Sequence, residues 1–337
     1  MKSNFSNSQL SAHSTSAERN LILVHTKGFQ AIDDFICIRN FIAESSPDIE
    51  VFIAENESRC SVTRRRAARR PTFVFSPINL MTFRPDRGKI YEGRAMSKIR
   101  QVERLASAGL PVPKTALLGP DTKLGVAEWG EYVVLKPSLP AFQSKGQGIS
   151  LMCTEDVCYA PPEAYPPDHP GRYSPMIVQS YVHTGAAISN IRVLTLFGEP
   201  LYALQNWSKI ETVDLRPQMV RTENQIVAHQ SIVPEQKTLK LIDDDDVLAL
   251  ARAAYCACPE AALQGCDLLR DSRTGHLYVI EFNPGGNTWH FSSSRMLDAR
   301  ERLNEFGTEF AEKRKAQFDA FRTAAQVLAE HTRREAI

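Results

Sequence analysis

Two short apolar segments, 266–270 and 277–282, constrain this 337-residue chain more than any other feature, because each carries an oxygen-bearing side chain near one end. Their composition predicts two strands, and the turn residues between them predict antiparallel pairing. Glu281 and Asn283 lie two residues apart, so both side chains leave the same face of one strand, and Asp267 lies on the other strand. Three oxygen donors therefore converge at one end of the strand pair.

Converging carboxylate and amide oxygens are the ligands that a hard cation such as Mg²⁺ or Mn²⁺ prefers. The alternative is a solvated strand end with incidental acidic residues. The tripeptide 284–286, Pro-Gly-Gly, follows at once, which ends the strand and allows the backbone to approach a ligand closely. We therefore predict that Asp267, Glu281 and Asn283 hold a metal ion.

A candidate phosphate-binding region follows the predicted strand 132–137, which carries Lys136 at its end. The loop 143–150 is rich in Ser, Gly and Gln, so it offers backbone N–H groups to phosphate oxygens while Lys136 supplies a fixed positive charge. The loop has neither the Walker A spacing nor the G-x-G-x-x-G pattern of a dinucleotide-binding helix. A plain surface loop is the alternative interpretation of this segment on its own.

Two further strands carry features that a ligand would explain. The strand 176–182 leads directly to His183. Backbone groups of such a strand often bind adenine, although an ordinary strand has the same sequence pattern. Arg192 stands alone inside the β-branched segment 191–197, where a buried guanidinium needs an anionic partner.

The first part of the chain predicts a small parallel α/β unit. Residues 1–20 have the composition of a flexible tail, and strands then alternate with a helix and an arginine-rich stretch. The strands are expected at 21–24, 50–54 and 71–75, the helix at 33–44 and the arginines at 64–70. This alternation is typical of a doubly wound sheet.

Strands dominate the middle of the chain, and helices flank them. Helices are expected at 97–108, at 243–258 and from 295 onward, and strands at 176–182, 191–197 and 200–205. The stretch 161–175 holds six prolines and predicts an irregular connection. The phenylalanine-rich face of the last helix fits packing on its own domain or on a second subunit, so a homodimer stays open.

Taken in this order, the segments resemble the ATP-grasp superfamily, and they are most similar to the ribosomal-protein glutamate ligase, D-alanine–D-alanine ligase and glutathione synthetase type. The resemblance covers roughly residues 96–294, and the order of its pieces is more specific than any single piece. The pieces are the helix with Lys98 leading into 108–115, the strand 133–137, the loop 146–149, the strands 178–182 and 190–193, and the pair 265–269 and 279–284.

The resemblance implies a mixed α+β and α/β architecture, in which ATP and Mg²⁺ are clamped between two lobes of an ATP-grasp fold. It divides the chain into five parts. These are a flexible tail (1–20), a pre-ATP-grasp α/β domain (21–95), a small lobe with a phosphate lid (96–183), a large lobe with the metal site (184–294) and a C-terminal helix (295–337).

The resemblance also implies a role for each matching residue. Lys136 would contact the α- or β-phosphate of ATP, Lys98 would reach the phosphates from below, and Arg192 would face the transferred phosphate, so that Lys136 and Arg192 are the catalytic pair. The lid would consist of Ser144, Lys145, Gly146, Gln147 and Gly148. The adenine hinge would consist of Gln179, Ser180, Tyr181 and Val182, with His183 near the ribose. One or two Mg²⁺ ions would be held by Asp267, Glu281 and Asn283.

The chain departs from the family pattern at several places. Asn190 stands where the family usually has an aspartate before the strand arginine, and no second arginine follows 201–205. The lid has few glycines, and the tail 285–290, Gly-Gly-Asn-Thr-Trp-His, is unusual. Trp289 and His290 fit either core packing or substrate contact, which leaves the acceptor unidentified.

The activity that the resemblance implies is that of an ATP-dependent carboxylate–amine ligase. Such an enzyme activates a small-molecule carboxylate as an acyl phosphate for attack by an amine, and it releases an amide, ADP and phosphate. One alternative is an ATP-grasp kinase that stops at a phosphorylated small-molecule acceptor, which the missing second arginine and the unusual tail motivate. The other is a non-catalytic ATP-binding protein.

Composition narrows the expected partners. The chain has 40 Lys and Arg against 39 Asp and Glu, a net charge of +1, which disfavours a protein that coats nucleic acid. Its seven cysteines follow no disulfide spacing, and no stretch reaches the ~18 apolar residues of a membrane span. We therefore expect a cytoplasmic protein without nucleic-acid or membrane partners. The arginines at 64–70 fit a solvated helix face or recognition of an acidic substrate.

Overall fold

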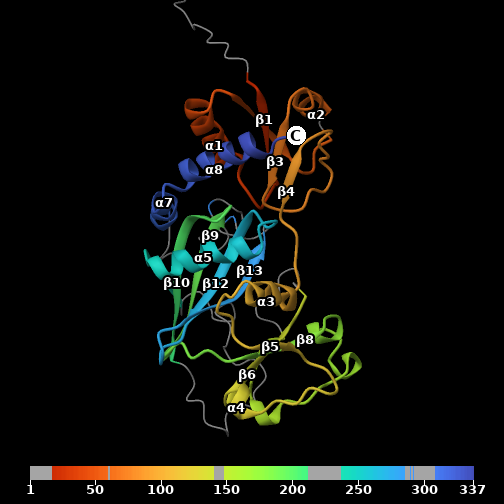
Figure 1. Ribbon diagram of the computed structural model, residues 1–337, viewed down its shortest axis with the longest axis vertical. Helices are drawn as coiled ribbons and strands as arrows, with labels where there is room; N and C mark the ends of the chain where they lie inside the picture. The colour runs from red at the N-terminus through yellow and green to blue at the C-terminus, as the bar shows by residue number, and fades with distance from the viewer. Residues whose placement is uncertain are drawn as a thin grey trace, which may run out of the picture.

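The computed structural model describes residues 17–59, 61–139, 148–211, 237–284, 289, 291 and 308–337. These residues form a mixed α/β fold with one parallel and two antiparallel sheets that follow one another along the long axis (Figure 1). The parallel sheet lies at one end, a five-stranded antiparallel sheet in the middle and a four-stranded antiparallel sheet at the other end. The predicted fold class, α/β followed by α+β, is confirmed.

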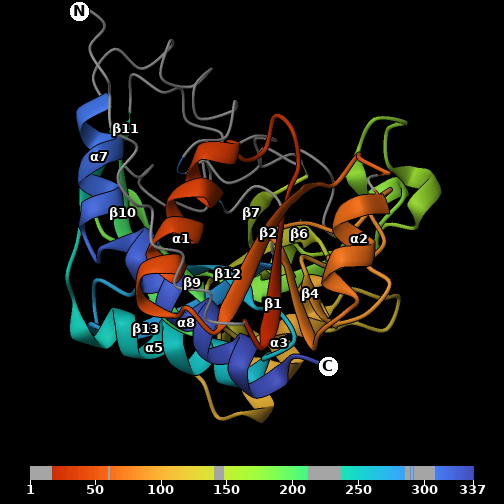
Figure 2. The ribbon, with the colours of Figure 1, turned by 90° about the horizontal axis from the view of Figure 1, so that it is seen from above.

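The parallel sheet is doubly wound, with strand order β2-β1-β3-β4. Side chains alternate between its faces, so Leu21 and Leu23 pack with α1, whereas Ile22 and Val24 pack with Ala67 of α2. Figure 2 shows α1 and α2 on opposite sides of β1. The elements are β1 (Arg19–His25), α1 (Ile32–Ser45), β2 (Ile49–Glu55), α2 (Ser61–Ala67), β3 (Thr72–Ser76) and β4 (Lys89–Glu92). β1 begins at Arg19, two residues before the predicted strand.

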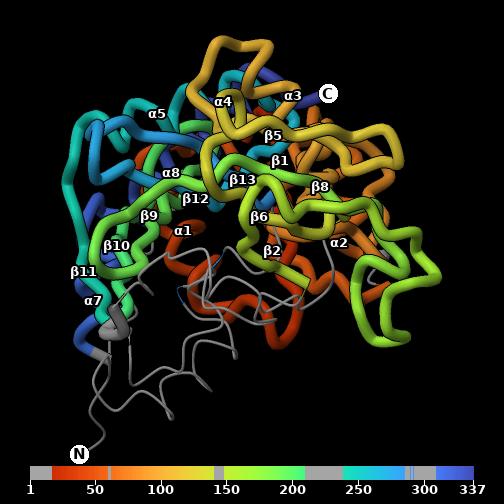
Figure 3. The backbone as a smooth tube through the Cα atoms, turned by 90° about the horizontal axis from the view of Figure 1, so that it is seen from below, coloured from red at the N-terminus to blue at the C-terminus, as the bar shows by residue number. Residues whose placement is uncertain are grey.

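The small antiparallel sheet has the strand order β5-β8-β6-β7. Figure 3 shows β5, β8 and β6 of this sheet from below. Its elements, with the two adjoining helices, are α3 (Lys98–Ser107), β5 (Thr115–Leu117), α4 (Val126–Trp129), β6 (Tyr132–Pro137), β7 (Ser150–Cys153) and β8 (Met176–Ser180). The proline-rich connection 161–175 contains only short 3₁₀ turns, at Pro162–Ala164 and Pro170–Arg172, as predicted. A further 3₁₀ turn, Thr154–Asp156, precedes it.

The middle sheet has the strand order β11-β10-β9-β12-β13. Its elements are β9 (Ala187–Leu196), β10 (Glu199–Glu211), β11 (Lys237–Leu241), α5 (Asp245–Ala257), β12 (Leu263–Arg270) and β13 (Leu277–Pro284). α5 packs on one face, where Val247 and Ala251 join Val193 and Cys266 in one apolar cluster. Asp244 caps this helix by accepting a 3.2 Å hydrogen bond from the Val247 N–H, so this aspartate has a structural role.

The predicted C-terminal helical segment consists of two helices over its described residues, α7 (Thr308–Ala316) and α8 (Ala320–Glu335). The break between them contains Asp319, which has a φ of 45°. Leu328 and Ala324 of α8 join the core that α1 and β1 form, so this helix packs on its own chain. Within the described residues, no helix is long and apolar enough to cross a membrane.

Candidate active site

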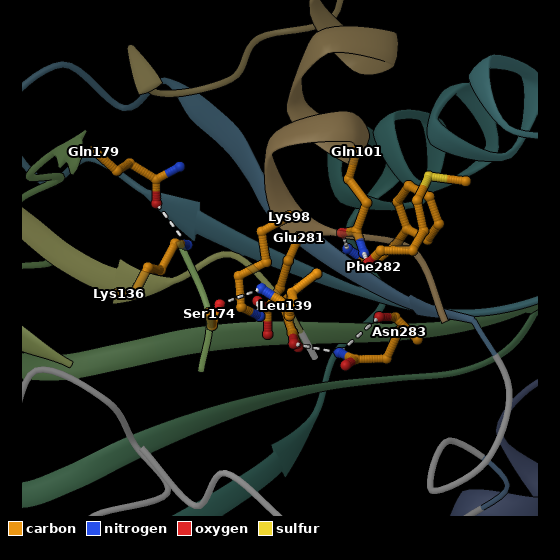
Figure 4. Close-up of polar contacts among 12 residues, drawn as sticks. Lys98, Gln101, Lys136, Leu139, Ser174, Gln179, Glu281, Phe282 and Asn283 are labelled. Atoms are coloured by element: carbon orange, nitrogen blue, oxygen red, sulfur yellow. Dashed lines mark hydrogen bonds and ion pairs between the residues drawn. The ribbon is translucent and has the colours of Figure 1, made fainter. Parts of the chain in front are cut away.

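Six of the residues predicted from the sequence interact where α3, β6, β9, β12 and β13 meet. Figure 4 labels four of them, Lys98, Lys136, Glu281 and Asn283. They are three cations, two carboxylates and one amide, contributed by one helix and four strands. The set is Lys98, Lys136, Arg192, Asp267, Glu281 and Asn283.

Arg192 and Asp267 are cross-strand partners of β9 and β12. The guanidinium donates from Nε to Oδ1 at 2.7 Å and from a terminal nitrogen to Oδ2 at 2.6 Å. Asn283 donates from Nδ2 to the same Oδ2 at 3.0 Å, which leaves its own carbonyl oxygen available to a cation. The partly buried arginine therefore has the anionic partner that its position in a strand required.

Lys98, the first residue of α3, forms an ion pair with Glu281 of β13. Its side chain reaches this strand because its backbone N–H donates to the Ser138 carbonyl at 2.7 Å, fixing the start of the helix against the small lobe. Gln101 adds a second anchor: its Oε1 accepts from the Phe282 N–H at 3.0 Å, and its Nε2 donates to the Met96 carbonyl at 3.0 Å.

Lys136 lies at the end of β6, and only 5% of it is exposed. Its Nζ donates to Oε1 of Gln179 at 2.9 Å, and Nε2 of Gln179 donates to Oγ1 of Thr115 at 2.8 Å (Figure 4). Three strands of the small sheet, β5, β6 and β8, thus position one ammonium group. Gln179 was predicted as part of an adenine hinge; in the structure its side chain orients Lys136.

The electrostatics of the site follow from burial and from the three cations. Burial lowers the pKa of Lys136 to about 8, although Glu281 opposes the shift. Burial alone would raise the pKa of Glu281, but Lys98, Lys136 and Arg192 together lower it to about 2. Burial raises the pKa of Asp267, although Arg192 acts in the opposite direction. The set of charges therefore holds Glu281 ionised beside two ammonium groups.

The segment after β8 joins the small lobe to the middle sheet. The N–H of Ser180 donates to the Lys114 carbonyl at 2.8 Å, and that of Tyr181 donates to the Tyr132 carbonyl at 3.2 Å. Val182 is buried, and the rings of Tyr181 and His183 meet edge to face at 4.7 Å. The predicted hinge residues are thus in one connected segment, in which two backbone N–H groups already have protein partners.

Four of the predicted lid residues, Ser144, Lys145, Gly146 and Gln147, lie outside the described residues. Gly148 is described and has a φ of 70°; a Cβ there would approach Pro170 to 3.2 Å and Pro137 to 3.3 Å. On the other side, the Leu139 N–H donates to Oγ of Ser174 at 2.9 Å (Figure 4). Both flanks of the predicted lid are therefore held against the segment 170–175.

Trp289 is a core residue. It is fully buried, its Nε1 donates to Oδ2 of Asp34 at 2.8 Å, and its ring stacks on Phe35 with 5.5 Å between ring centroids. Of the two interpretations left open by the sequence, core packing is the one that the structure supports. His290 lies outside the described residues.

The arginine-rich stretch at 64–70 is a helix face paired with acidic neighbours. Arg66 and Arg70 contact Glu50 at 3.2 Å and 2.5 Å, and Arg64 forms an ion pair with Asp86. These contacts are those of a solvated basic face.

The donor set at the ends of β12 and β13 fits a hard cation. Asp267, Glu281 and Asn283 offer only oxygen atoms, which Mg²⁺ and Mn²⁺ prefer. In the part of the chain that the structure describes, no group of three or more His, Cys, Asp or Glu is placed to hold a metal, so any cation here depends on two carboxylates and one amide.

Sequence reasoning missed Gln101 and Thr115 as parts of this site. Gln101 had a detectable signal, because it lies on the apolar stripe of its helix beside Val102 and Leu105, and a buried amide there needs polar partners. Thr115 had none, since a threonine in a short strand is ordinary.

No family model matches the sequence, and no curated protein matches it significantly. Solved structures similar to this chain include D-cycloserine synthetase DcsG (16% identity, 93% of this chain and 99% of that chain, TM-score 0.48). ATP-grasp ligase PsnB in complex with a minimal precursor (14%, 92% and 99%, 0.49) and D-alanine–D-alanine ligase from Bacillus anthracis (11%, 92% and 99%, 0.41) are also similar. The likeness spans nearly the whole chain. At such low identities and TM-scores it gives no information on substrate or mechanism.

Proposed function

We propose that this chain is an ATP-grasp enzyme and acts as an ATP-dependent carboxylate–amine ligase that forms an amide, ADP and phosphate. The observation that carries the proposal is the convergence of Lys98, Lys136 and Arg192 with the carboxylates of Asp267 and Glu281. The positively charged side chains can bind the negative phosphates of a nucleoside triphosphate. The acidic side chains beside them can bind the metal ion that accompanies it.

In this proposal the position of each side chain in the site determines whether it binds phosphate, metal or adenine. Lys136, oriented by Gln179, contacts the α- or β-phosphate, and Lys98 contacts the phosphates from the start of α3. Asp267, Glu281 and Asn283 hold Mg²⁺, which when bound neutralises phosphate charge and orients the transferred group. The segment 179–183 lies at the adenine, and the lid covers the β- and γ-phosphates.

The reaction needs positioning and charge neutralisation more than a nucleophile on the protein. A carboxylate oxygen of the substrate attacks the γ-phosphorus, the bond to the β-phosphate oxygen breaks, and ADP leaves. The amine nitrogen then attacks the acyl carbon, loses a proton and expels phosphate. Arg192 balances the charge that builds on the transferred phosphoryl group, because its guanidinium keeps further N–H donors in the same fixed plane beyond the two that bind Asp267. No covalent intermediate forms on the protein.

An ATP-consumption screen against amino acids and small carboxylic acids, each with and without an added amine, tests the proposal. A ligase requires both acid and amine for full turnover and yields an amide. A stable phosphorylated product without amine dependence would identify a kinase instead. ATP binding without any turnover above that of Lys136→Met would identify a non-catalytic ATP-binding protein.

A further inference from the structure

The turn between β12 and β13 contacts the segment that joins the small antiparallel sheet to the middle sheet. This joining segment, residues 181–186, follows β8 and precedes β9. The Ser272 N–H of the turn donates to the His183 carbonyl at 2.7 Å. Beside this hydrogen bond, Gly185 has a φ of 102°, and a Cβ there would lie 3.5 Å from the Cβ of Ser272. The turn and the joining segment are therefore both packed together and hydrogen-bonded.

The shape of the turn is fixed by one buried carboxylate. Asp271 is 6% exposed, and its Oδ1 accepts from the Arg273 N–H at 2.8 Å and from the Thr274 N–H at 3.1 Å. Its backbone carbonyl accepts from the Gly275 N–H at 2.8 Å. Burial alone would raise the pKa of Asp271, but the two N–H groups and the Arg273 guanidinium lower it, so the carboxylate is charged at pH 7. An aspartate that accepts from the next N–H groups along the chain holds a turn closed.

The two strands that this turn connects carry the proposed acidic metal ligands. Asp267 lies on β12 four residues before Asp271, and Glu281 lies opposite Asp267 in the register of β12 and β13. With a rise of ~3.3 Å per residue, the turn lies ~13 Å along the hairpin from these two carboxylates. One hairpin therefore contacts the joining segment at its turn and contains the metal ligands farther along its strands.

The joining segment is also bound to the strand that carries Lys136. The Tyr181 N–H donates to the carbonyl of Tyr132, the first residue of β6, at 3.2 Å, and Lys136 lies near the other end of that strand. The segment is thus hydrogen-bonded on one side to the strand of the buried ammonium group and on the other to the hairpin of the metal ligands.

This arrangement matters for a ligand that has two binding parts, such as a base and a set of phosphates with their metal ion. Two covalently joined parts bind more tightly than the separate parts only when the protein holds the two subsites at the matching separation. The hydrogen bond between the turn and the joining segment sets the separation between the proposed adenine residues and the proposed metal ligands.

We propose that Asp271 is a positioning residue, which acts through the hydrogen bond from Ser272 to His183 and holds the adenine-binding segment at a fixed separation from the metal ligands. The inference deepens the proposed function and rests on it for the identity of the ligand. Asp271 touches neither nucleotide nor metal in this account, and it acts on affinity for the whole nucleotide rather than on chemistry.

Amide hydrogen exchange of the full chain, followed by NMR spectroscopy, tests the contact itself. In Asp271→Ala the N–H groups of Arg273 and Thr274 lose their acceptor, so the turn loosens and the Ser272 amide should exchange about threefold to tenfold faster than in the wild-type protein. Asp271→Asn keeps an oxygen acceptor and should restore slow exchange. Asp48→Ala is the matched control, because it removes a carboxylate that pairs with Arg333 of α8 at 2.8 Å, and it should leave the Ser272 amide unchanged.

Affinity measurements by isothermal titration test the positioning role, with ADP and pyrophosphate as probes, each with Mg²⁺. ADP contains both binding parts, whereas pyrophosphate contains only the phosphates. Asp271→Ala should bind ADP about threefold to tenfold more weakly than the wild-type protein, while its affinity for pyrophosphate should stay within about twofold. Asp271→Asn should restore ADP affinity, and Asp48→Ala should bind both probes as the wild-type protein does.

Three results would overturn the proposal: an unchanged exchange rate of the Ser272 amide in Asp271→Ala, an unchanged ADP affinity in that variant, or an equal loss of ADP and pyrophosphate affinity, which general loosening of the site would produce. In each of these cases the wild-type protein still binds ADP, so the proposed function stands. A wild-type protein that does not bind ADP would refute the proposed function instead, so the two failures are distinguishable.

Discussion

Arg192 and Asp267 face each other across β9 and β12 and form a two-point ion pair at 2.7 Å and 2.6 Å, in which the arginine side chain is 20% exposed and the aspartate 6%. The proposed function gives them opposite partners, phosphate for the arginine and a metal ion for the aspartate. In this structure each neutralises the other, so both charges are tolerated in a buried site and held in position.

Replacing Arg192 by lysine keeps the positive charge but loses the two parallel hydrogen bonds to Asp267. We expect kcat for ADP formation to fall roughly 100-fold, because the charge would no longer be held at the transferred phosphate. Steady-state assays of ADP formation, with the acid and amine found by screening, measure kcat. Arg252→Lys is the matched control, since Arg252 lies half-exposed beside Glu199. A wild-type rate in Arg192→Lys would exclude a catalytic role for the guanidinium.

Glu281→Gln tests the metal assignment, because it keeps the shape of a proposed ligand and removes its charge. The Mg²⁺ concentration that half-saturates ADP binding should rise by roughly tenfold or more. Isothermal titration at several Mg²⁺ concentrations measures it. Glu260→Gln removes an exposed carboxylate that pairs with Arg104 and should change nothing. If both variants bind ADP with the same Mg²⁺ dependence as the wild-type protein, Glu281 is not a metal ligand.

The lowered pKa of Lys136 predicts a pH dependence of nucleotide binding. The side chain is charged below about pH 8 and loses its charge as the pH rises through that value, so ADP affinity should decline between pH 7 and 9. Lys136→Met should bind ADP weakly, and its ADP affinity should not decline over this pH range. An unfolded lysine titrates near 10.5, so the contribution of Lys136 to the free energy of unfolding rises from pH 8 to 10.5. Fluorescence titrations with ADP from pH 7 to 9 measure these affinities. If the ADP affinities of Lys136→Met and the wild-type protein depended on pH in the same way, Lys136 would not be the titrating group.

Gln101→Leu should reduce the stability of the fold without changing any residue that is proposed to bind phosphate or metal. It leaves the buried Phe282 N–H without its 3.0 Å acceptor, so the free energy of unfolding should fall by about 1–3 kcal/mol in urea denaturation. ADP affinity should fall too, because the start of α3 carries Lys98. Glu103→Leu alters an exposed position of the same helix and serves as the control. Equal urea denaturation midpoints for Gln101→Leu and the wild-type protein would show that the hydrogen bond between Gln101 and the Phe282 N–H does not stabilise the fold.

Much of the site could be predicted because it depends on local spacing. The positions of Asp267, Glu281 and Asn283 follow from the period of a strand and the direction of a turn, which fix the face and the end on which side chains lie. The parallel sheet was predictable for the same reason, since its buried strands are short apolar runs separated by helical patterns.

The partnerships could not be predicted, because they join residues far apart in the sequence. Lys98 and Glu281 are 183 residues apart, and Trp289 and Asp34 are 255 apart, so only tertiary packing brings them together. A tryptophan near a metal motif has the same sequence pattern whether it binds substrate or fills a core. Its hydrogen bond to Asp34 and its stacking on Phe35 decide between the two.

The most direct test of the proposed chemistry replaces the unknown amine with hydroxylamine, which traps acyl phosphates as hydroxamates. The protein is incubated with ATP, Mg²⁺, hydroxylamine and the panel of carboxylic acids, and hydroxamate and ADP are quantified together. A ligase predicts, for at least one acid, equal amounts of ADP and hydroxamate, both lost in Lys136→Met. ADP formation with a stable phosphorylated acceptor and no hydroxamate would contradict the account.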